Sequence, residues 1–258
     1  MPLITLTTDF GQADWFVGSM KATMLSVSSR LRMVDITHSV PPGDVKAGAF
    51  ALFASCRYFP SNTIHLVVVD PGVGSSRKPI VVKTSNFCFI GPDNGVLSYA
   101  LAEEEVESIH SIENASLFVQ PVSRTFHGRD LFAPVAAHLA KGLPVTGVGP
   151  ALSSFIQLDW TKPTSCDRKW LGEVVYIDHF GNAITNLPAN LIEDSSPAAR
   201  EVMLANGTRI PIGHYYQQAG ANQPIALVGS TEYLEIAING GNAAKLLDLK
   251  VGAPIVAL

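Results

Sequence analysis

The feature that most constrains the fold is a change of pattern after Leu152. Before this point, short β-branched segments alternate with amphipathic segments of helix length, which is typical of a parallel sheet covered by helices. The expected strands of this half are Ile4–Thr8, Met33–Thr37, Thr63–Val69, Ile80–Thr84 and Phe87–Ile90. The first half therefore predicts an α/β domain with a Rossmann-like sheet and helices on both faces.

Two segments in this half predict helices in some detail. From Val45 to Cys56, apolar residues recur at helical spacing after a Pro-Pro-Gly-Asp entry, and Asp44 is the expected N-cap. A second helix is expected from about Leu131 to Lys141, and Pro134 restricts its start because proline is tolerated only in the first helical turn. His127 consequently lies at a helix entrance.

The second half predicts a different kind of domain. Short strands alternate there with Gly, Asn and Pro turns, which is typical of an all-β, barrel-like domain. The expected strands are Glu173–Ile177, Ala183–Asn186, Glu201–Leu204, Thr208–Ile212, Ile225–Val228, Tyr233–Ile238 and Pro254–Ala257. We therefore expect an α/β domain over residues 1–155, a linker over 156–170 and a β-barrel domain over 171–258.

Composition narrows the classes of function. The chain has 258 residues, 47% of them hydrophobic, and a net charge of −4 without runs of like charge, which argues against nucleic acid as a partner. Cys56, Cys88 and Cys166 form no Cys-x-x-Cys pair, so we expect no metal site and a reducing compartment. The sequence shows neither a signal peptide nor an apolar run of 18 residues, which predicts a cytoplasmic protein without a membrane partner.

Two acidic residues follow expected strands of the α/β domain, at the edge where such sheets bind ligands. Asp9, in Thr-Asp-Phe-Gly, could accept hydrogen bonds from both hydroxyls of a ribose, although a plain strand-to-loop turn explains it equally well. Asp70 and Arg77 flank a Gly-rich loop that lacks the Gly-Lys-Ser/Thr ending of a phosphate-binding loop. The alternative for this pair is a structural turn with a surface ion pair.

Further polar segments are candidates in both domains. His127 lies in a stretch too polar for core packing, yet a capping histidine is an alternative, and no second histidine at metal-ligand spacing accompanies it. Asp178, Phe180 and Asn182 combine an acid, an aromatic ring and an amide, which suits recognition of a purine or of a sulfonium cation. Alone, these segments name no ligand.

Taken in order, these motifs resemble the hydroxide adenosyltransferase family, which is related to the halide-using fluorinase and chlorinase. The matching segments span both expected domains and read TDFG, DITHSVPPGDV, VVVDPGVGSSR, GPDNGVL, TFHGRDLFAPVAAHLA, IDHFGNAITN and YLEIAINGGNAA. The resemblance implies an N-terminal α/β domain, a C-terminal β-barrel and a homotrimer with active sites between subunits. It implies S-adenosyl-L-methionine as a small-molecule substrate, and no cofactor.

The resemblance also implies roles for particular residues. Asp70, Arg77 and His127 would handle the attacking water. The substrate-binding residues would be Asp9 at the ribose, Asp178 and Ser230 at the methionine end, Phe180 and Asn182 at the adenine, and the backbone around Asn239 at the base edge. The halide-using relatives carry a tyrosine where this chain has Asp70, so the resemblance favours water as the nucleophile.

The sequence thus predicts an enzyme that hydrolyses S-adenosyl-L-methionine to adenosine and L-methionine by attack of water on the 5′ carbon. Two alternatives remain. One is halide-dependent transfer to the same carbon, and the other is a sensor that binds adenosine or S-adenosylmethionine without turnover.

Overall fold

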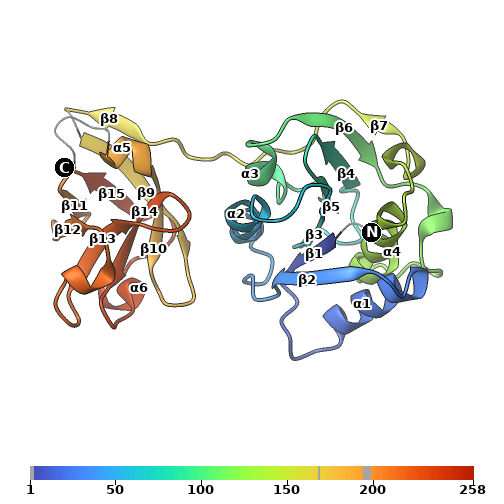
Figure 1. Ribbon diagram of the computed structural model, residues 1–258, viewed down its shortest axis with the longest axis horizontal. Helices are drawn as coiled ribbons and strands as arrows, with labels where there is room; N and C mark the ends of the chain where they lie inside the picture. Colours follow the sequence, from blue (N-terminus) through green and yellow to red (C-terminus); the bar gives the residue numbers. More distant parts are fainter. Residues whose placement is uncertain (1–2, 168, 194–198) are drawn as a thin grey trace. The chain divides into compact units, whose positions relative to one another are not determined.

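Contacts between residues divide the chain into two units, residues 1–159 and 160–258. The computed structural model in Figure 1 describes residues 3–167, 169–193 and 199–258. The division lies within the stretch 156–170 that was expected as a linker. Part of that stretch is nevertheless ordered sheet, because strand β8 (Thr164–Cys166) pairs antiparallel with strand β9 (Lys169–Ile177).

The first unit is built on a seven-stranded sheet with the order β2-β1-β3-β5-β4-β6-β7. Its strands are β1 (Leu3–Thr8), β2 (Arg32–Thr37), β3 (Ile64–Val68), β4 (Pro79–Thr84), β5 (Cys88–Pro92), β6 (Val106–Ser111) and β7 (Ala151–Leu152). The five expected strands are all present, with ends that differ by one or two residues. The expected α/β class is confirmed.

The expectation of a parallel sheet holds only for part of it. Strands β2, β1, β3 and β5 are parallel, whereas β4, β6 and β7 run antiparallel to their neighbours. The reason is the connection from β4 to β5, which spans only residues 85–87. A parallel pair needs a crossover of a dozen or more residues, so this short connection makes a hairpin.

Helices cover both faces of this sheet (Figure 1). They are α1 (Phe16–Val27), α2 (Val45–Cys56), α3 (Ser98–Leu101), α4 (Ala133–Ala140), the 3₁₀ turns η1 (Ala115–Leu117) and η3 (Val145–Gly147), and the π-helix η2 (Gly128–Phe132). The N-cap of α2 is confirmed, since Asp44 Oδ1 accepts a hydrogen bond of 2.9 Å from the backbone of Ala47. Helix α1 was not predicted, although its buried Met20 and Met24 show helical spacing.

One core lies between the sheet and helices α1 and α4. It includes Ile4 and Leu6 from β1, Met20 from α1 and Phe132 next to α4, all fully buried. Residues of both β1 and β3 are buried in this core. The two strands are parallel neighbours, so they end at the same edge of the sheet. Asp9 and Asp70 follow these two strands at that edge.

The second unit is a closed barrel of seven strands, as expected. The sheet order is β10-β14-β13-β12-β11-β15-β9, and pairing of β9 with β10 closes it. The remaining elements are β10 (Ala183–Pro188), α5 (Ala189–Glu193), β11 (Glu201–Leu204), β12 (Arg209–Gly213), η4 (Tyr216–Gln218), β13 (Pro224–Val228), β14 (Tyr233–Ile238), α6 (Ala243–Leu246) and β15 (Pro254–Ala257). Strands β11, β14 and β15 have the predicted bounds, and their inward side chains fill the barrel.

Candidate active site

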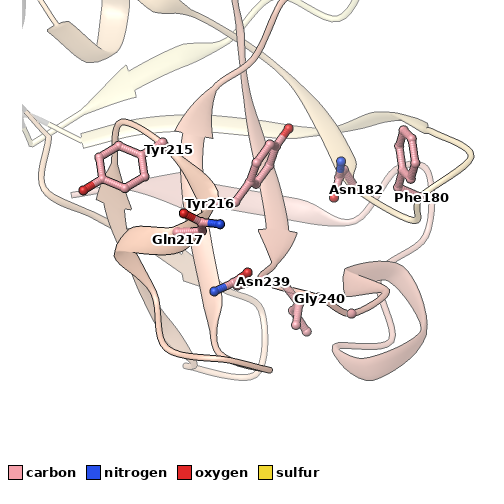
Figure 2. Close-up of a pocket in the computed structure, with 9 residues that line it drawn as sticks. Phe180, Asn182, Tyr215, Tyr216, Gln217, Asn239 and Gly240 are labelled. Carbon is pink, nitrogen blue, oxygen red and sulfur yellow. The ribbon is translucent and has the colours of Figure 1, made fainter.

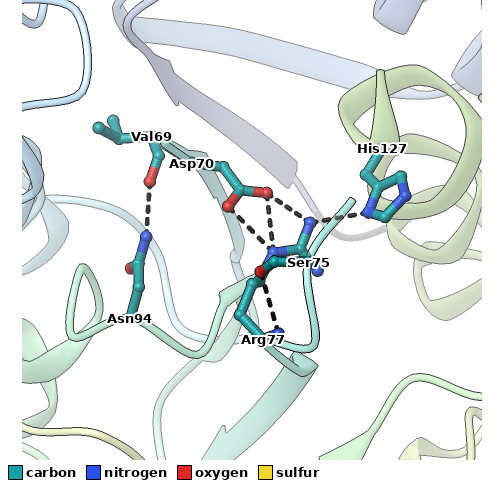
Figure 3. A network of polar contacts seen from close by, with 6 residues as sticks. All are labelled: Val69, Asp70, Ser75, Arg77, Asn94 and His127. Carbon is teal, nitrogen blue, oxygen red and sulfur yellow. Dashed lines mark hydrogen bonds and ion pairs between the residues drawn. The ribbon is translucent and has the colours of Figure 1, made fainter. Parts of the chain in front are cut away.

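An Arg–carboxylate pair lies at the end of strand β3 (Figure 3). Arg77 Nε donates to Asp70 Oδ1 at 3.0 Å and to Oδ2 at 2.9 Å, and Arg77 Nη2 also donates to Oδ2. The Asp70 side chain is 4% exposed and that of Arg77 is 9% exposed. The alternative of a surface ion pair is therefore wrong, and a buried pair of this kind is strongly constrained in orientation.

The same guanidinium joins the pair to a third residue. Arg77 Nη2 lies 2.8 Å from Nδ1 of His127, which immediately precedes the π-helix η2 (Figure 3). The guanidinium carbon also stacks over the Phe132 ring, 5.4 Å from its centroid. The structure thus brings Asp70, Arg77 and His127 together from segments up to 57 residues apart in the sequence.

The contact with Arg77 sets the protonation of His127. A guanidinium can only donate, so His127 Nδ1 accepts and the ring proton lies on Nε2. Burial lowers the pKa of His127 below its usual value, and the positive charge of Arg77 lowers it further, while Asp70 and Asp130 oppose the shift. A neutral imidazole therefore presents an N–H donor from its Nε2 atom.

Two residues that the sequence did not single out support the pair. Asn94 Nδ2 donates to the backbone oxygen of Val69 at 2.9 Å and so holds the residue just before Asp70 (Figure 3). Gly74, with φ of +78°, packs its backbone directly against the carbonyl of Arg124. The Gly-rich loop therefore packs closely against the segment that leads to His127.

Asp9 lies in the same unit and is also tied into its surroundings. Its Oδ2 atom accepts a hydrogen bond of 2.8 Å from the backbone of Gly43, just before helix α2. Asp9 is partly exposed, and among the described residues its other carboxylate oxygen, Oδ1, has no hydrogen-bond partner. One oxygen therefore anchors the side chain and the other is open to a ligand hydroxyl.

The barrel unit contains a cavity of about 690 Å³. Its wall is formed by Phe180, Asn182, Tyr215, Tyr216, Gln217, Ile238, Asn239, Gly240 and Gly241 (Figure 2). The volume is in the range of small-molecule sites, and aromatic rings with a few amides suit a purine. Three of the expected binding residues, Phe180, Asn182 and Asn239, lie on this wall.

The residues expected at the methionine end do not line this cavity. Asp178 Oδ1 accepts hydrogen bonds from the backbone of Phe180 at 2.9 Å and of Asn182 at 2.8 Å, and Oδ2 accepts from Asn182 Nδ2 at 3.0 Å. Asp178 thus shapes the turn that presents the two wall residues. Ser230 is exposed in the turn between β13 and β14. Tyr215, Tyr216 and Gln217 were missed because no sequence motif marks them.

The described residues, 3–167, 169–193 and 199–258, offer neither a metal site nor a membrane-spanning helix. Within those ranges, no group of three or more His, Cys, Asp or Glu side chains is arranged to hold a metal ion. In the same ranges, none of the helices has the length and apolar character needed to cross a membrane.

The fold and these sites define a two-domain enzyme in which an α/β unit carries an Asp–Arg–His cluster and a β-barrel carries a nucleoside-sized cavity. Residues 4–149 match the model of the SAM hydroxide adenosyltransferase N-terminal domain, and residues 172–256 match that of the C-terminal domain. The chain belongs to the SAM hydroxide adenosyltransferase family.

Similar proteins include hydrolases and fluorinases. An (R)-S-adenosyl-L-methionine hydrolase from Salinispora tropica is 37% identical over 97% of this chain and 95% of that protein. A fluorinase from Actinoplanes sp. is 26% identical over 98% of this chain and 96% of that protein. A crystal structure of an uncharacterised conserved protein from Thermotoga maritima superposes with a TM-score of 0.93 at 39% identity, covering 98% of both chains.

Proposed function

We propose that this enzyme hydrolyses S-adenosyl-L-methionine to adenosine and L-methionine. The observation that carries the proposal is the buried cluster of Asp70, Arg77 and His127, which offers charged and neutral groups for holding one water molecule. The hydrolase from Salinispora tropica, with 37% identity over nearly the whole chain, supports it.

The chemistry requires little activation of the substrate. The sulfonium leaves as a neutral thioether, so the bond from sulfur to the 5′ carbon breaks as water oxygen bonds to that carbon in line, and one proton passes to solvent. No step needs a cofactor or a metal. The protein's part is to orient one water and to remove it from competing solvent.

In this proposal, each residue of the cluster has a separate role. Asp70 accepts a hydrogen bond from the attacking water and so directs an oxygen lone pair at the 5′ carbon. Arg77 holds Asp70 and favours developing hydroxide character. His127 donates from Nε2, because Nδ1 is occupied by Arg77 in the described arrangement. In this mechanism, orientation of the water outweighs base catalysis.

We propose that the expected substrate-binding residues act at both ends of the substrate. Asp9 binds the ribose hydroxyls through Oδ1. Phe180 and Asn182 hold the adenine, with the backbone at Asn239 on the base edge. Asp178 and Ser230 bind the methionine end. The Phe180 side chain is 72% exposed, which supports a contact face that is available for a planar ligand.

We also propose a homotrimer with active sites between subunits, in the cytoplasm, with neither membrane nor nucleic acid as a partner. Support comes from the family to which the chain belongs and from its net charge of −4. Analytical ultracentrifugation of the purified protein tests the assembly, and a monomer at micromolar concentration would contradict it.

The test of the reaction is incubation with S-adenosylmethionine in heavy-oxygen water without halide, followed by mass spectrometry. Heavy oxygen in adenosine, with methionine as co-product, is the expected outcome. Formation of 5′-chloroadenosine at high chloride would favour the halide alternative. Saturable binding of intact substrate would favour a sensor and would remove the roles given to Asp70, Arg77 and His127.

The sulfonium stereochemistry can be tested in the same assay. The Salinispora tropica relative is named for the (R) form of S-adenosylmethionine. We propose the same preference here, because the two epimers exchange the positions of the methyl group and the methionine chain on sulfur, and one site for the methionine end can accept only one of these arrangements. Separate time courses on the resolved (R) and (S) epimers should show faster cleavage of the (R) form, and equal rates would contradict this preference.

A further inference from the structure

Strand β1 carries two buried Thr–His pairs that look alike but have different surroundings. Thr8 Oγ1 lies 2.8 Å from Nδ1 of His38, and Thr5 Oγ1 lies 2.8 Å from Nδ1 of His65. The two histidines are 1% and 0% exposed. Neither belongs to the cluster of the proposed reaction. Only the first pair adjoins Asp9.

His38 is connected to the loop that carries Asp9 at two points. Its backbone oxygen accepts a hydrogen bond of 2.7 Å from the backbone N–H of Gly11. Its ring contacts Thr8 Oγ1, which in turn accepts a bond of 3.3 Å from the backbone of Phe10. Asp9 therefore lies inside a short segment whose residues on both sides are bound, directly or through Thr8, to His38.

One set of proton positions satisfies the contacts of this chain when the His38 ring is neutral. Asp35 Oδ1 lies 3.1 Å from His38 Nε2, outside hydrogen-bond geometry but close enough for its charge to favour an N–H at Nε2. Nδ1 then carries a lone pair, so the Thr8 hydroxyl donates to it. The same hydroxyl oxygen remains free to accept from Phe10, which makes the two bonds compatible.

We infer that His38 is a positioning residue that fixes the carboxylate of Asp9 for recognition of the ribose hydroxyls. The inference rests on the ribose role proposed for Asp9. One Asp9 oxygen is held by Gly43, so the direction of the other depends on the backbone at residues 8–11. Two adjacent hydroxyls are recognised well only when the acceptor is held to within about 0.5 Å.

The second Thr–His pair provides a matched control. His65 packs among Phe59, Phe87 and Phe89, with ring centroids 5.0–5.6 Å away, and its side chain has no hydrogen bond to the described residues of the Asp9 loop. The variant His65→Leu also removes a buried imidazole, and the contact that it loses is likewise to a threonine of β1. Any general effect of losing such a pair appears in both variants.

The experiment compares wild type with His38→Leu, His38→Asn and His65→Leu by calorimetric binding of adenosine and of 2′,3′-dideoxyadenosine, which lacks both hydroxyls. The Kd for 2′,3′-dideoxyadenosine divided by the Kd for adenosine measures how strongly the protein recognises the two hydroxyls. We expect His38→Leu to reduce this ratio by roughly tenfold and to raise KM for S-adenosylmethionine more than it lowers kcat. His38→Asn, whose Oδ1 can accept from Thr8, should restore most of the ratio.

The results that would overturn the role of His38 differ from those that would overturn the role of Asp9. An unchanged ratio in folded His38→Leu, or an equal loss in His65→Leu, would overturn the inference. If His38→Leu does not fold, Thr8→Val removes the same hydroxyl contact at constant side-chain volume and must reduce the ratio. If wild type binds both nucleosides equally, the ribose role of Asp9 is wrong and the inference is rejected with it, whereas cleavage in heavy-oxygen water is judged separately.

Discussion

The guanidinium Nη2 of Arg77 lies 2.8 Å from Nδ1 of His127, and this contact leaves the imidazole with a single free nitrogen that carries a proton. Arg77 therefore determines which hydrogen bond His127 can make as well as how Asp70 is oriented. A water molecule between Asp70 and His127 would meet one acceptor and one donor, which fixes its rotation as well as its place.

The first prediction concerns pH. Burial and Arg77 lower the pKa of His127 below its usual 6.5, so the neutral ring persists as pH falls through that value and charges only at lower pH. The acid limb of kcat/KM should therefore lie below pH 6.5. Rate measurements between pH 4.5 and 9 check this, and a limb at or above 6.5 would contradict it. In Arg77→Gln, NMR titration should show a higher His127 pKa than in wild type.

The second prediction concerns the charge of Asp70. Asp70→Asn keeps the side-chain shape and one acceptor oxygen but loses the charge that pairs with Arg77, so we expect kcat to fall by about 10²-fold or more with a small change in KM. Steady-state kinetics measure both. The exposed pair of Glu201 and Arg209 provides a control, because Glu201→Gln should leave kcat within about twofold of wild type. Equal kinetics for the two variants would remove Asp70 from the mechanism.

The third prediction concerns the Gly-rich loop. A Cβ atom on Gly74 would overlap the carbonyl of Arg124, so Gly74→Ala must displace the loop that carries Arg77. We expect at least a tenfold loss of kcat in a folded protein, on the order of 1.4 kcal/mol of barrier. Gly207→Ala is the control, since Gly207 has a similar φ of +83° but open space around it. Similar activity losses in the two variants would point to backbone strain and not to the contact with Arg124.

The fourth prediction concerns stability of the barrel. Burial raises the pKa of Glu235, and the negative charge of Asp178 raises it further. The hydrogen bond of 2.6 Å from the Tyr216 hydroxyl lowers this pKa but does not cancel the rise. A raised pKa means that the folded state prefers protonated Glu235, so its stabilisation is present below pH 4.5 and is lost as pH rises. Glu235→Gln should therefore raise the Tm at pH 7 by on the order of 2 °C, with less effect at pH 4.

The control for this prediction is Glu107→Gln, which neutralises an exposed carboxylate on β6. Thermal melts of both variants across pH 4–8 separate a general charge effect from the buried position of Glu235. A Tm difference for Glu235→Gln that does not grow with pH would contradict the stated cause.

Much of the fold could be predicted because local rules determine it. Asp44 caps α2 through its own side chain, and β11, β14 and β15 are short runs between turn residues. The direction of β4 could not be predicted from the spacing of its apolar residues, because side chains alternate between the two faces in the same way in parallel and antiparallel strands. The π-helix at Gly128–Phe132 has no sequence signature either, because it extends directly into an ordinary helix.

In the candidate site too, local sequence predicts some features and others depend on tertiary packing. Asp70 and Arg77 could be paired from their places around a Gly-rich loop, but the contact with His127 depends on packing 50 residues away. Tyr215 and Tyr216 lie in a short segment that no motif marks, and only the cavity shows that they face a common space. The resemblance to a family supplied what the individual residues could not, namely a ligand that requires all of these groups.

The burial of Asp70 and Arg77 has a consequence for how the protein responds to its surroundings. Dissolved ions screen solvated charges over about 10 Å at 0.1 M salt but act weakly on a pair shielded from water. In the proposed mechanism, the field of this pair at the attacking water is therefore screened only weakly by the ionic strength of the medium. In a cell that gains or loses salt under osmotic stress, we therefore expect the contribution of this pair to the rate of the chemical step to change little.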